Sequence, residues 1–190
     1  MENNENKILT PKEIADTFEA KVKDNLMKYL QENDKVDKHI PECIDVEECW
    51  PKIIRDYLPD GAREFQQYPV VSLGWMMLIG MAMAYFWDED WTKHSAEEHI
   101  YHLLRDKRGY DNMDDAILED ILKYEGESVA KESAVVQDCA SRVYGLLSHE
   151  QVEPGTEAAF GCYLAALHQL YLAGMAMELK TLGYHMTKIG

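Results

Sequence analysis

The segment from residue 88 to residue 102 carries the side chains best suited to bind a metal ion. His99 and His102 are three positions apart, so on a helix their imidazole rings lie one above the other. Imidazole and carboxylate groups together bind divalent transition metals. We expect the turn before Ser95 to bring a carboxylate close to these two rings. The candidate metal ligands are therefore Asp88, Asp90, His94, His99 and His102.

The same segment also has an interpretation without a metal. Ser95 and Glu98 have the spacing of a capping box, in which the side chains of both residues satisfy backbone groups at the start of a helix. Di-iron bundles repeat a Glu-x-x-His motif on a second helix, and this sequence has no such repeat. We therefore predict no cofactor, and a divalent metal ion remains the alternative.

His168 is the other candidate for chemistry. It lies between Leu164 and Leu172 in an apolar segment, where a histidine could act as a general base in a buried pocket. No serine, cysteine or carboxylate lies at helical spacing to complete a catalytic set. A structural role inside the core is therefore the preferred interpretation, with His168 kept as the candidate catalytic residue.

Known catalytic signatures are absent from the sequence. We find no glycine-rich phosphate loop, no dinucleotide fingerprint, no His-Glu-x-x-His and no Gly-x-Ser-x-Gly. Glu97-Glu98 resembles the start of a helical pyrophosphohydrolase motif, but the third carboxylate is missing. These observations favour a protein that is not an enzyme. The four cysteines form no Cys-x-x-Cys pair, and we expect free thiols.

The net charge of the chain limits the classes of partner that it can bind. The 190 residues carry a formal net charge of −16. Nucleic-acid binding depends on cations that neutralise phosphates, so we exclude DNA and RNA. An anionic membrane surface is excluded for the same reason. The polar, acidic start of the chain lacks the pattern of a signal peptide, which favours a cytoplasmic location.

Hydrophobic periodicity predicts an all-α fold, an irregular bundle of about four long helices with short ancillary ones. Thr10-Pro11-Lys12-Glu13 reads as a capping box with proline at the first helical position. We expect residues 1–190 to form one domain, with a flexible segment 1–10 and a polar connecting arm 33–49. A short helix over 51–58 should end at Pro59. The long helices are expected at 11–32, 70–90, 127–148 and 157–182.

Two segments, 65–87 and 158–177, contain no charged residue. Each is long enough to span a bilayer. The first lacks a positively charged flank, and the second has a histidine and a glutamine at its middle. We therefore expect two central helices of a bundle that does not enter a membrane. Gly80 and Gly174 lie in matching Gly-Met-Ala-Met strings, and we expect close contact there, with each other or with a second copy of the chain.

These observations leave two hypotheses of function. The preferred one is an interaction or assembly module that forms a homodimer or binds a protein partner through apolar helix faces. The alternative is a helical enzyme or small-ligand binder, metal-dependent in one version, that uses the cluster at 88–102 or His168.

Overall fold

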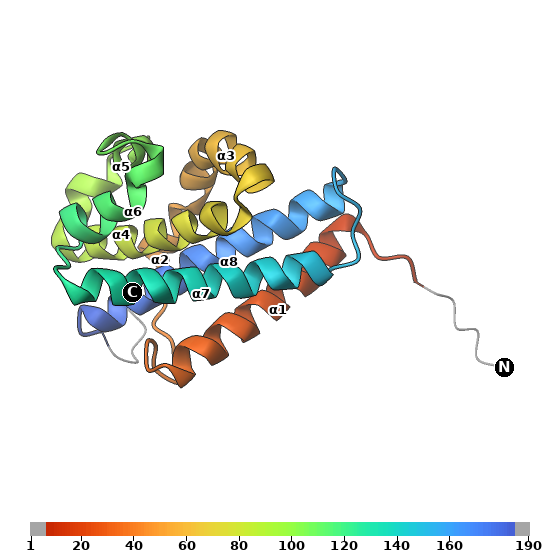
Figure 1. The fold of residues 1–190 in the computed structure, drawn as a ribbon, viewed down its shortest axis with the longest axis horizontal. Helices are drawn as coiled ribbons and strands as arrows, with labels where there is room; N and C mark the ends of the chain where they lie inside the picture. The colour runs from red at the N-terminus through yellow and green to blue at the C-terminus, as the bar shows by residue number, and fades with distance from the viewer. Residues whose placement is uncertain (1–6, 185–190) are drawn as a thin grey trace.

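A computed structural model describes residues 7–184, and within this range the fold is all-α without strands, as predicted. Segment 1–10 was expected to be flexible, and most of it lies outside the described residues. Figure 1 shows the long helices packed side by side, with residues 50–67 and 100–121 lying along one side of the helix formed by residues 69–95. The elements are α1 (Pro11–Glu32), α2 (Ile44–Glu48), α3 (Trp50–Gln67), α4 (Pro69–Ser95), α5 (Ile100–Asp106), η1 (Tyr110–Asn112), α6 (Met113–Asp115), η2 (Ala116–Ile121, a π-helix), α7 (Glu127–His149) and α8 (Glu157–Thr181).

The four long helices match the predicted ranges closely because their local signals agree with their packing. Thr10 accepts a hydrogen bond from the Glu13 N–H, and the Glu13 carboxylate accepts one from the Thr10 N–H, which completes the expected capping box. Phe18, Val22, Leu26 and Leu30 form the buried stripe of α1.

The four cysteines are buried with free thiols.

The two charge-free segments form α4 and α8, which cross at the centre of the bundle and run in the same direction (Figure 1). A Cβ added to Gly80 would lie 2.1 Å from the carbonyl oxygen of Tyr171, and one added to Gly174 would lie 2.0 Å from that of Met77. Each backbone therefore occupies the space that a side chain would need on the other helix. The expected contact at both glycines is confirmed, and it lies within one chain.

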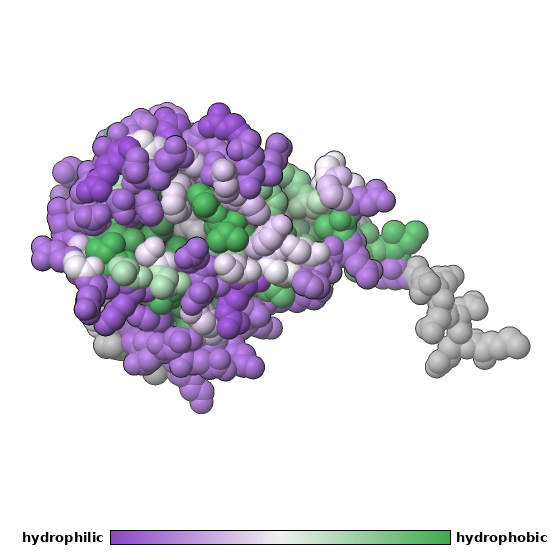
Figure 2. Space-filling view, viewed as in Figure 1, coloured by the Kyte–Doolittle hydropathy of each residue, from purple (hydrophilic) through white to green (hydrophobic). Residues whose placement is uncertain are grey.

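One helix of the described part, α4, is long and apolar enough to span a membrane. Its most apolar window is 72% buried inside the fold, which is typical of a core helix. Figure 2 shows that hydrophilic residues cover most of the visible face, while hydrophobic residues gather in smaller patches.

Three local predictions were wrong. α3 does not end before Pro59 but continues to Gln67, because Ile53, Tyr57 and Gly61 form one buried face along it. Gly61 leaves room for the ring of Tyr57, since an added Cβ would lie 2.2 Å from that ring. This packing outweighs the cost of an internal proline, about 3 kcal/mol.

The segment 33–49 is more than a polar arm, since it contains α2 and the buried residues Val36, Cys43, Val46 and Cys49. The capping box expected at Ser95 and Glu98 does not form. Ser95 is instead the last residue of α4, and the Glu98 carboxylate binds Arg55. The backbone of α4 does break at Asp90, where the helix was expected to end.

Candidate metal centre

His99 and His102 lie together at the start of α5, as expected. Their rings stack with centroids 5.4 Å apart and an angle of 11° between planes. The i, i+3 spacing on a helical turn produces this arrangement. Both rings face α3, where the carboxylate of Asp56 completes a group whose ligand atoms all lie within 4.8 Å of one another.

The other candidates do not join this group. Asp88 accepts a hydrogen bond from the hydroxyl of Tyr184, and Asp90 accepts one from the backbone N–H of Lys93. His94 stacks on Phe86 with ring centroids 4.1 Å apart, and its Nε2 lies 3.5 Å from a carboxylate oxygen of Glu89. The expected carboxylate from 88–90 is therefore replaced by one from a different helix.

Asp56 is held in place by its neighbours. Its side chain is only 9% exposed, and one carboxylate oxygen, Oδ2, lies 2.9 Å from Nδ1 of His99. The Arg55 guanidinium donates to both carboxylate oxygens, and this interaction lowers the pKa of Asp56 to about 2. The carboxylate is therefore ionised at neutral pH, as a metal ligand must be.

The turn between α4 and α5 is fastened to α3 by two cations. Lys52 donates to the backbone carbonyls of Ser95 and Glu97. Arg55 donates to the carbonyl and to the carboxylate of Glu98. These contacts fix the position of the two histidines relative to Asp56.

Arg55 also sets a condition on metal binding. One of its guanidinium nitrogens lies 3.4 Å from Nδ1 of His99. Its side chain is half exposed and forms ion pairs with Asp56 and Glu98. A metal ion bound by this group would therefore lie close to the positive charge of Arg55, which opposes its binding.

His168 lies apart from this group, and it has a carboxylate partner that helical spacing could not reveal. Its Nδ1 lies 2.7 Å from Oε1 of Glu19 on α1, and its ring packs on Trp50 at 4.9 Å. The hydrogen bond with His168 lowers the pKa of Glu19. A shallow cavity of about 200 Å³ opens beside this pair, between α1 and α8. The pair fixes one side of the His168 ring, and it adds a polar interaction to the contact between α1 and α8.

Sequence reasoning missed Asp56 and Glu19. Asp56 precedes His99 by 43 positions, and Glu19 precedes His168 by 149. Only the packing of separate helices brings these carboxylates to the histidines, and no local motif records it. Comparison with known proteins returns no matching family model, no matching curated protein and no matching solved structure.

Proposed function

We propose that this chain binds a divalent transition-metal ion through Asp56, His99 and His102. The observation that carries the proposal is the meeting of two imidazoles and one ionised carboxylate, supplied by two helices that are fastened together. Two histidines and one carboxylate form the ligand set of many zinc and non-haem iron sites.

Three protein ligands leave coordination positions open for water or a substrate. The side chain of His99 is 59% exposed, so these positions are accessible from solvent. A metal ion held here would act as a Lewis acid on a bound oxygen. Asp56 and the histidines would supply orientation, and Arg55 would lie close enough to contact an anionic group bound to the metal.

The alternative of an interaction or assembly module stays a prediction. It depended on surplus apolar surface along the two charge-free segments. In the fold these segments cover each other, with residues from Leu73 to Ala84 buried except for Trp75. The apolar surface on which that hypothesis rested is therefore buried within the chain. This burial favours the metal-binding hypothesis over the interaction module.

The test is metal binding by untagged protein prepared without chelators. Isothermal titration with Zn²⁺ should show one site, and Co²⁺ should give a visible d–d spectrum with histidine ligation. Loss of a residue that only supports a metal ligand already costs about 10- to 100-fold in affinity. His102→Gln and Asp56→Asn, which remove ligands, should therefore each weaken binding at least tenfold.

Asp88→Asn and His94→Gln are matched controls, since they remove the same group types outside the triad. They should bind metal like the parent. Circular dichroism would verify that each variant is folded. Absence of binding at 100 μM metal, or equal weakening by the control variants, would refute the site.

A further inference from the structure

A cavity of about 330 Å³ lies between the end of α4, α5 and η2. These elements lie at the left of Figure 1. Its apolar walls include Phe86, Ile100, Leu104 and Ile121. Leu103 also lines it and is about half exposed. The cavity therefore offers a hydrophobic interior with an opening to solvent, of the size that small organic ligands occupy.

Two departures from regular helix shape this cavity. The backbone break at Asp90 redirects the end of α4 and places Lys93 and His94 at the edge. On the opposite wall, Asp120 and Ile121 belong to the π-helical element η2. π-Helical turns occur frequently at functional sites because they re-aim side chains that a regular helix would hold elsewhere.

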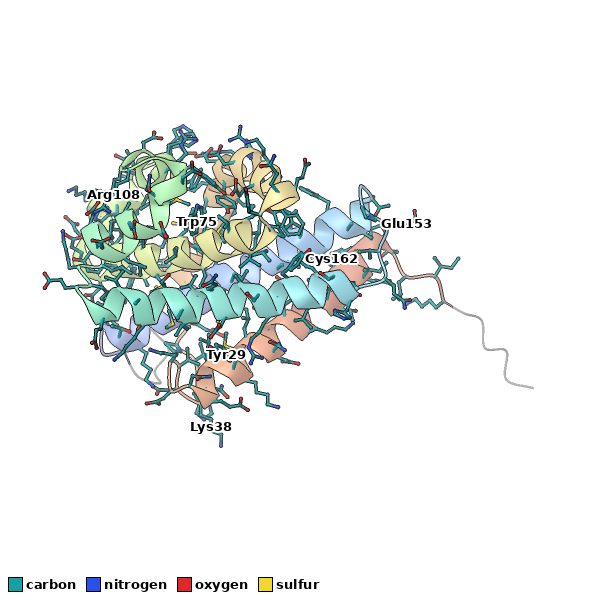
Figure 3. The ribbon with its side chains drawn as sticks, in the orientation of Figure 1. Tyr29, Lys38, Trp75, Arg108, Glu153 and Cys162 are labelled. Atoms are coloured by element: carbon teal, nitrogen blue, oxygen red, sulfur yellow. The ribbon has the colours of Figure 1, made fainter. Side chains whose placement is uncertain are left out.

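Three lysines, Lys93, Lys107 and Lys123, line the cavity. Among residues 7–184, none of their ammonium groups has a carboxylate within ion-pair distance. Asp120 lies on the same wall, but Arg108, labelled in Figure 3, binds both of its oxygens at 2.7 and 2.9 Å. The lysines therefore keep their positive charge available, in a chain whose net charge is −16.

The remaining carboxylates of the cavity cancel only part of this charge. Glu89 lies 3.5 Å from His94, which offsets the carboxylate only when the imidazole is protonated. Glu89 and Glu97 therefore oppose three ammonium groups, which leaves one positive charge in excess. A positive rim over an apolar interior matches a molecule that is anionic at one end and apolar at the other, because each part then meets its complement.

We propose that this cavity binds a small organic carboxylate with an apolar body. The carboxylate lies at the lysine rim, and the apolar body lies between Phe86, Ile100 and Leu104. This site is independent of the metal centre, since α5 presents His99 and His102 to α3 and presents Ile100 and Leu103 to the cavity. The result at one site therefore does not decide the proposal for the other, and the two can be tested separately.

The first test compares decanoate with decanol by isothermal titration, because the two share an apolar chain and differ in charge. Decanoate should bind in one-to-one ratio, at least tenfold more tightly than decanol. The triple variant Lys93→Gln, Lys107→Gln, Lys123→Gln should lower decanoate affinity at least tenfold and leave decanol affinity within twofold.

A matched control replaces Lys12, Lys28 and Lys131 by glutamine, three exposed lysines away from the cavity. It changes the net charge equally and should bind decanoate like the parent. Leu103→Asp is a second cavity variant at an exposed position, and it should also weaken decanoate at least tenfold. Equal loss in the control, or parental binding by both cavity variants, would overturn the proposal, as would absence of decanoate binding at 1 mM.

Discussion

Glu178 is a carboxylate inside the hydrophobic core, and replacing it by glutamine should change how stability depends on pH. Its side chain lies on α8 and is 2% exposed. The hydroxyl of Tyr124 donates to its Oε2 at 2.7 Å. Burial raises its pKa to about 7, and the nearby charges of Glu132 and Asp88 act in the same direction.

The direction in which stability changes with pH follows from proton binding. Between the ordinary value of 4.5 and about 7, the folded protein holds a proton on Glu178 that the unfolded chain releases. Stability from this group is therefore present at low pH and is lost as pH rises through 7. With about 1.4 kcal/mol for each pKa unit, the loss between pH 5 and pH 8 amounts to about 2–3 kcal/mol.

Glu178→Gln keeps the shape and the acceptor for Tyr124 but cannot ionise. The free energy of unfolding, measured in urea at pH 5 and at pH 8, should differ little between variant and parent at pH 5. At pH 8 the variant should be more stable by about 2–3 kcal/mol. Glu32→Gln removes an equal charge from an exposed position and serves as the control.

Equal destabilisation of Glu178→Gln at both pH values would contradict this prediction, because Glu178 would then act through its hydrogen bond alone. A gain at pH 8 in Glu32→Gln would also contradict it. In that case the net charge of −16, and not the buried carboxylate, would set the pH dependence.

Three further perturbations test the contacts described above. Arg55→Gln should weaken Zn²⁺ binding, since it removes the contacts that hold Asp56 and the turn before α5 in place; tighter binding by titration would show that the charge of Arg55 opposes the metal more than its contacts support the site. Gly80→Ala and Gly174→Ala should each destabilise by more than about 3 kcal/mol in urea unfolding, because backbone atoms oppose the new methyl group. Gly145→Ala, with no atom within 4 Å, should instead stabilise by up to about 1 kcal/mol, and equal losses at all three glycines would contradict the packing. Thr10→Ala should reduce the unfolding free energy by about 1 kcal/mol through loss of the helix cap, and no change in melting temperature would count against it.

The predictable part of this fold is the part that local chemistry determines. The start of α1 follows from Thr10 and Glu13, whose side chains bond to backbone groups within one turn. The crossing at Gly80 and Gly174 follows from small residues in segments too apolar to face water. Local signals failed at Pro59, where the long-range packing of Tyr57 decided the outcome.

The candidate site could also be predicted from the sequence only in part. The neighbours His99 and His102 could be paired from their spacing, since both lie on one helical turn. Their third partner could not, because Asp56 reaches them only when α3 packs beside α5. Glu98 shows why a motif can mislead: its carboxylate fitted a capping box, yet the guanidinium of Arg55 is a stronger partner than a backbone N–H.

The crossing of α4 and α8 has a consequence for biosynthesis. Roughly 90 residues separate the two glycines, so at the usual speed of translation α4 emerges ~5–20 s before the part of α8 that covers it. During that interval the nascent chain carries a helix with the length and hydropathy of a membrane span and without its main packing partner. Chaperones and the membrane-insertion machinery recognise such segments by their length and their hydropathy. Synthesis of this protein therefore includes an interval in which α4 lacks the cover of α8, and the packing of α8 against Gly80 ends it.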